Sequence, residues 1–94
     1  MISNLWEHIS ITKTHTDSST MITTVDLTIQ GTPFTVVRGI RDGKNSTLLS
    51  GDNFHLILSC NEIKDWDHVQ YLRGFMGLRQ VRRNVSEYLK GERT

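Results

Sequence analysis

Residues 24–37 read TVDLTIQGTPFTVV, and the fold predicted for this chain depends on them. Apolar and polar residues alternate before the glycine, which is the period of a strand with one buried face. The apolar face of this strand carries Val25, Leu27 and Ile29. Gly31-Thr32 predicts a two-residue type II′ turn, which would pair Ile29 with Phe34. Because sequential strands usually pair, the hairpin predicts an antiparallel meander.

Strand-like segments flank this hairpin on both sides. Residues 5–15 are rich in β-branched side chains, and residues 47–50 predict a short strand. Residues 54–60, FHLILSC, are apolar on both faces, which indicates a central strand covered on one side by a second layer. Glycine, aspartate and asparagine in residues 41–46 predict a loop. We therefore expect four or five antiparallel strands within residues 4–60.

The last third of the chain has the three-to-four spacing of amphipathic helices. One apolar stripe carries Trp66, Val69, Leu72 and Met76, and a second carries Leu78, Val81, Val85, Tyr88 and Leu89. At about 100° per residue these stripes point roughly 150° apart, so one straight helix would not bury both against a sheet. We expect two helices broken at Gly74–Gly77, where each glycine costs about 1 kcal/mol of helix propensity relative to alanine. Gly91 predicts a left-handed cap at the end of the second helix.

These segments predict one small α+β domain over residues 1–94. The sheet would occupy residues 1–61, and the helical segment, residues 62–94, would pack on one of its faces. A chain of 94 residues with 36% hydrophobic content has the size of a single core.

Charge and cysteine content limit the classes of partner and compartment. The formal charge is +1, so no global electrostatic attraction to nucleic acid or anionic lipid is expected. The basic excess is confined to residues 78–94. A single cysteine, Cys60, leaves no internal disulfide, and the N-terminus has no secretory pattern, so we expect a cytoplasmic protein. The apolar runs are too short for a membrane span.

No pattern in the sequence predicts a catalytic, metal or cofactor site. His55 and Cys60 would point to opposite faces of one strand, which is unlike the close ligand pairs of structural zinc sites. Residues 39–47 contain glycine, lysine, serine and threonine without the spacing of a phosphate-binding loop. We therefore expect a non-enzymatic protein with no cofactor.

A basic row is predicted on the second helix. Arg79, Arg83 and Lys90 fall in one sector opposite the apolar stripe, and Arg82 lies on the flank of that sector. Such a row could contact phosphates or an acidic protein surface. Glu87 stands one turn after Arg83, however, and an ordinary solvated helix face with an i, i+4 ion pair is the competing interpretation.

Two further places are candidates for partner contact. Phe75 lies about 100° from Met76, so it would stay outside if the first stripe alone were buried, and an exposed aromatic residue could anchor a partner protein or a homodimer. The alternative is that the glycine break turns Phe75 into the core. Arg41 and Lys44 lie in the predicted loop, which could also contact a partner.

Two functions remain as hypotheses from the sequence. The first is a protein-binding module that acts as an inhibitor or adaptor, with a phage or mobile-element inhibitor of a host system as one form. The alternative is a nucleic-acid-binding protein that uses the basic face of residues 79–93.

Overall fold

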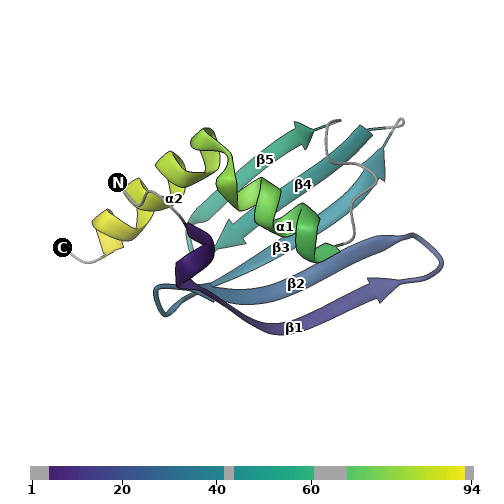
Figure 1. The fold of residues 1–94 in the computed structure, drawn as a ribbon, viewed down its shortest axis with the longest axis horizontal. Helices are drawn as coiled ribbons and strands as arrows, with labels where there is room; N and C mark the ends of the chain where they lie inside the picture. The colour runs from purple at the N-terminus through teal and green to yellow at the C-terminus, as the bar shows by residue number, and fades with distance from the viewer. Residues whose placement is uncertain (1–4, 42–43, 61–67, 93–94) are drawn as a thin grey trace.

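A computed structural model describes residues 5–41, 44–60 and 68–92 of the chain (Figure 1). The elements are η1 (Leu5–His8), β1 (Ile9–Asp17), β2 (Ile22–Ile29), β3 (Thr32–Arg41), β4 (Lys44–Gly51), β5 (Phe54–Cys60), α1 (His68–Gly77) and α2 (Arg79–Glu92). The strands form one five-stranded antiparallel sheet in the order β1-β2-β3-β4-β5, and both helices lie across the same face of it. The predicted α+β class and the meander order are confirmed.

The β2–β3 hairpin has a different turn from the one predicted. Ile29 pairs with Thr32 instead of Phe34, so the loop residues are Gln30 and Gly31. Both have positive φ, 52° and 83°, which is the type I′ pattern whose twist matches that of the flanking strands. The Gln30 N–H also donates to the His8 carbonyl at 3.0 Å. Since the register differs by two residues, every side chain keeps its predicted face.

Other local predictions also need correction. Residues 5–8 form a short 3-10 helix instead of the start of the first strand. The loop expected over residues 41–46 is shorter, because β3 extends to Arg41 and pairs it with Lys44 at the start of β4. Residues 42–43 lie outside the described ranges. The short strand expected at residues 47–50 is therefore an eight-residue strand, Lys44–Gly51.

The turn between β1 and β2 is closed by Asp17. The Ser19 hydroxyl and the Ser19 N–H donate to its carboxylate at 2.7 and 2.9 Å. These bonds favour the ionised carboxylate, so they hold the pKa of Asp17 below its usual range, with the hydroxyl as the larger cause. Met21 then adopts a φ of 60°, and its N–H donates to the Asp17 carbonyl at 2.7 Å.

The core lies between the sheet and the two helices. The sheet contributes Val25, Leu27, Ile29, Phe34, Val36, Leu49 and Phe54, and the helices contribute Tyr71, Leu72, Phe75, Met76, Val81, Val85 and Leu89. The second predicted stripe is thus confirmed at Val81, Val85 and Leu89. On α1 the predicted stripe is confirmed at Leu72 and Met76, and Tyr71 and Phe75 are buried beside them, while Trp66 and the Val69 side chain lie outside the described set.

An aromatic cluster attaches the C-terminal helix to the sheet. The rings of Phe34, Phe54 and Tyr88 lie 5.0–5.7 Å apart, with Phe34 edge-on to the other two. Gly51 makes room for this cluster, since a Cβ there would stand 3.1 Å from two ring carbons of Phe34. The Tyr88 hydroxyl also donates to the Asp52 carbonyl at 3.4 Å.

The predicted helix break is present at the end of α1. The Leu78 N–H donates to the Phe75 carbonyl, and the Leu78 carbonyl accepts the first bond of α2 from the Arg82 N–H. Gly74 and Gly77 lie inside α1, and α2 begins at Arg79. The break is therefore confined to Leu78 and is shorter than the predicted segment 74–77. The cap expected at Gly91 was wrong, because α2 continues to Glu92 and Gly91 has no positive φ.

We expect Gly77→Ala to stabilise the protein. Gly77 is helical without a positive φ, and no atom lies within 4 Å of an added Cβ. Alanine should therefore raise the free energy of unfolding by about 0.5–1 kcal/mol in urea denaturation, mainly by restricting the unfolded chain. The same change at Gly31, where φ is 83°, should destabilise. A loss of stability in Gly77→Ala would contradict this account of the helix junction.

Candidate interaction surfaces

The sheet face opposite the helices is divided into a polar and an apolar half. The polar half covers β1, β2 and the start of β3, where the outward positions are mostly threonine and aspartate. Asp26 accepts a hydrogen bond from the Thr35 hydroxyl at 3.0 Å, and its backbone carbonyl accepts one from the Thr12 hydroxyl at 3.0 Å. Polar outward side chains such as these are typical of an antiparallel sheet face that contacts water.

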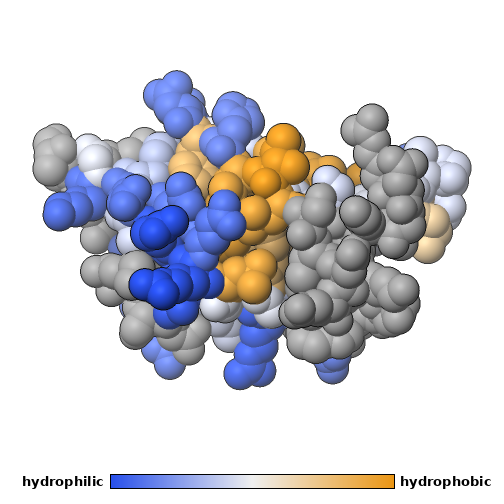
Figure 2. Space-filling model, turned by 90° about the horizontal axis from the view of Figure 1, so that it is seen from above, coloured by the Kyte–Doolittle hydropathy of each residue, from blue (hydrophilic) through white to orange (hydrophobic). Residues whose placement is uncertain are grey.

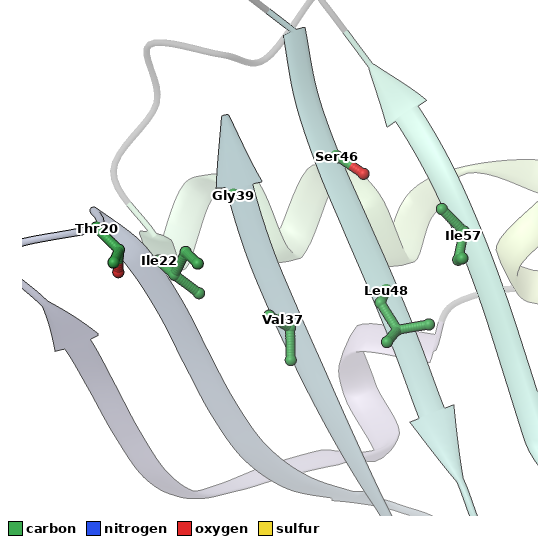
Figure 3. Close-up of a pocket in the computed structure, with 7 residues that line it drawn as sticks. All are labelled: Thr20, Ile22, Val37, Gly39, Ser46, Leu48 and Ile57. Carbon is green, nitrogen blue, oxygen red and sulfur yellow. The ribbon is translucent and has the colours of Figure 1, made fainter. Parts of the chain in front are cut away.

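The apolar half lies over the other end of the strands, on β2 to β5. It is formed by Ile22, Val37, Leu48 and Ile57, which we call the apolar patch. Val37 pairs with Leu48 and Leu48 pairs with Ile57, so three of the four side chains are direct cross-strand neighbours. Ile22 and Ile57 are 39% and 67% exposed, and the close-up shows all four on the side of the sheet away from the helices (Figure 3).

Small residues give the apolar patch a shallow depression. Gly39 and Ser46 pair with each other beside the larger side chains. A Cβ at Gly39 would lie 3.6 Å from the Ile22 side chain, so Ile22 leans over a position that has no side chain. With Thr20 at the rim, these residues enclose about 350 Å³ that is open to solvent (Figure 3). The surface can therefore receive an apolar group of modest size.

The sequence predicted no role for the apolar patch, although one signal was present. Residues 54–60 were expected to form a central strand because both of their faces are apolar. That expectation was wrong, since β5 stands at the end of the strand order. The expected cover on one side is present, because Leu56 and Leu58 pack against the core on the helix side, and the second apolar face of β5, at Ile57, is exposed.

The basic row on α2 is exposed as predicted. Arg79, Arg83 and Lys90 are exposed, and Arg82 is half-buried on the flank. Glu87 is also exposed and lines the same small depression as Arg83, Ser86 and Lys90. An acidic group therefore interrupts the row, and whether it contacts a ligand stays a prediction.

Phe75 occupies the second of the two positions that the sequence allowed. It is 0% exposed, and its ring stacks on Tyr71 with the centroids 6.4 Å apart and the planes 11° from parallel. A partner could reach Phe75 only if α1 moved. Arg41 and Lys44 are joined by backbone pairing at the β3–β4 end, and their side chains lie outside the described set.

A polar contact that the sequence did not predict lies under α1. The hydroxyl of Thr47, which is 0% exposed, hydrogen-bonds the hydroxyl of Tyr71. Arg38, the cross-strand neighbour of Thr47, places its guanidinium carbon 3.8 Å from the centroid of the Tyr71 ring. This cluster fixes α1 over β3 and β4, which is a structural role.

Among residues 5–41, 44–60 and 68–92, no three histidine, cysteine, aspartate or glutamate side chains could jointly hold a metal ion. No helix in the described part of the chain has the length and hydrophobicity to cross a bilayer. No protein family model, curated protein or solved structure matches this sequence.

Proposed function

We propose that this protein is a non-enzymatic, cytoplasmic protein-binding module that contacts its partner through the apolar patch, as an inhibitor or adaptor does. The observation that carries the proposal is the row Val37, Leu48 and Ile57 on adjoining strands of the helix-free face. Single exposed hydrophobic side chains are common on proteins, but contiguous ones mark interaction sites.

The polar half of the same face supports this choice. Outward positions on β2 are filled by Thr24, Asp26 and Thr28. The fold therefore tolerates polar outward side chains, and the core on the opposite face does not require apolar residues at positions 37, 48 and 57. Because exposed apolar side chains carry an aggregation cost, their presence here favours a binding role.

A capture experiment with matched variants tests the proposal. The immobilised chain is incubated with lysate of the native host, and bound proteins are identified by mass spectrometry. Val37→Thr combined with Leu48→Thr removes the centre of the apolar patch while keeping side chains that suit strands. We expect the wild-type chain to retain a defined protein. The double variant should recover at least tenfold less of that protein.

The control separates the apolar patch from the basic row. Arg79→Glu with Arg83→Glu leaves the sheet unchanged, so it should retain the same partner. Circular dichroism melts of both double variants check that they are folded. Recovery of no protein by the wild type, or equal recovery by the Val37→Thr, Leu48→Thr variant, would refute the proposal.

Nucleic-acid binding is the alternative function, and the exposure of Arg79, Arg83 and Lys90 on one helix is the observation that favours it. Phosphate contacts release counterions, so affinity for any sequence should fall steeply with salt. Replacing Arg79 and Arg83 with glutamate should then reduce the slope of log affinity against log salt concentration by about two. Unchanged retention of that variant on heparin would exclude this alternative.

A further inference from the structure

The two edges of the sheet are protected to different degrees. Edge strands expose backbone N–H and C=O groups, and proteins discourage unwanted pairing there with bulges, proline and charged residues. On β1 the register shifts between Ile11 and Lys13, and the strand carries Lys13 and Asp17. Eight of its nine residues are exposed. β1 is therefore a poor template for a further strand.

β5 has none of these protections. Its seven residues, FHLILSC, include no proline, lysine, arginine, aspartate or glutamate. Its register with β4 is regular from Phe54 to Cys60. Within the described ranges, β4 is its one strand neighbour. The backbone of β5 on the side away from β4 is thus a regular template for another strand.

The side chains of β5 are apolar toward both faces of the sheet. Leu56 and Leu58 pack against the core on the helix side but stay half-buried, and Ile57 is 67% exposed on the other side. Viewed from the β5 side, hydrophobic side chains gather at the middle of the molecule, beside the hydrophilic end that contains α2 (Figure 2). A strand laid along this edge would bury apolar surface on both faces at once.

We propose that β5 pairs antiparallel with β5 of a second copy of this chain, with Ile57 opposite Ile57 of the second copy. The order of residue types in FHLILSC reads almost the same in both directions. In this register Leu56 meets Leu58, His55 meets Ser59 and Phe54 meets Cys60, so apolar residues meet apolar ones and polar residues meet polar ones. A two-fold interface requires such self-complementarity.

Other registers match less well. Because side chains alternate between the two faces of a strand, a one-residue slip would pair Ile57 with Leu56 or Leu58, which face the opposite side of the sheet. A two-residue slip keeps the faces but shortens the overlap and leaves an end of β5 without a partner strand. The register centred on Ile57 is the one that pairs all seven residues.

The dimer would have a definite arrangement. The two-fold axis of an antiparallel strand pair is normal to the sheet, so both pairs of helices lie on one face and both apolar patches on the other. The two patches then meet at Ile57. This inference stands independently of the proposed function, since it rests on the backbone edge and the sequence of β5.

Solution mass and a site-specific crosslink test the dimer. The full chain should elute with the mass of two 10.8 kDa subunits in light-scattering measurements at tens of micromolar. Ile57→Lys places two ammonium groups face to face at the axis and should give the monomer. Ile22→Lys, on the same sheet face but away from β5, should leave the dimer intact. Circular dichroism of both variants checks that they fold.

A cysteine variant tests the register. Residues directly opposite each other in an antiparallel pair have Cα atoms about 4.5–5.5 Å apart, which is within disulfide range. In a Cys60→Ser background, Ile57→Cys should therefore crosslink to a covalent dimer under oxidised glutathione at least tenfold faster than Ile22→Cys. A monomeric wild type, equal dissociation by Ile22→Lys, or equal crosslinking of the two cysteine variants would overturn the proposal.

Discussion

Phe75→Ala should lower the free energy of unfolding by about 3–5 kcal/mol, enough to leave a small domain largely unfolded at moderate temperature. Phe75, on α1, is completely buried in the core between the sheet and the helices, where it stacks on Tyr71. Removing its ring loses apolar burial and leaves a cavity that the packed sheet below cannot fill. Urea denaturation followed by circular dichroism measures the loss.

The matched control for this change lies two residues earlier on the same helix. Arg73 is exposed, and alanine is a good helix former, so Arg73→Ala should change the free energy of unfolding by less than about 0.5 kcal/mol. Equal stability of the two alanine variants would show that α1 does not pack on the sheet through Phe75. It would also restore Phe75 as a candidate contact for a partner.

Tyr71→Phe should cost about 1–3 kcal/mol, although it removes a single oxygen. The hydroxyl of Thr47 is fully buried and bonds the Tyr71 hydroxyl, so the variant leaves a buried polar group without that partner. The phenyl ring keeps its place against Phe75 and beneath the Arg38 guanidinium. The decrease in the free energy of unfolding should therefore come from the lost hydrogen bond and not from lost packing.

A double-mutant cycle isolates the contribution of this hydrogen bond. Thr47→Val has nearly the shape of threonine and removes the other hydroxyl, so the double variant buries no polar group at this point. We expect Tyr71→Phe with Thr47→Val to be more stable than the sum of the single losses implies, by about 1 kcal/mol or more. Strict additivity would mean that the two hydroxyls do not interact in solution.

The inward face of the β2–β3 hairpin and the meander order of the strands could be predicted from the sequence, but the register of that hairpin could not. Alternation placed Val25, Leu27 and Ile29 on one face, and that face is the buried one. The turn forms at Gln30-Gly31 and not at Gly31-Thr32. The observed turn matches the twist of the strands and is joined by the bond from the Gln30 N–H to the His8 carbonyl. That bond joins residues far apart in the chain, so no local pattern reports it.

The candidate surfaces divide in the same way. The basic row of Arg79, Arg83 and Lys90 follows from helical spacing alone, because one face of a helix is fixed by position in the chain. The contact of Thr47 with Tyr71 spans 24 residues and has no local pattern. The apolar patch combines residues of β2, β3, β4 and β5, so it exists only after the sheet has formed.

The sequence by itself determined the α+β class, the inward face of the β2–β3 hairpin and the division of the C-terminal segment into two helices. These features depend on the spacing of apolar residues along one segment, and that spacing is local. The tertiary structure decided which apolar surfaces are covered. Both helices are needed on one face to bury their two stripes, so no element remains in the described chain to cover Ile57 and its neighbours on the other face.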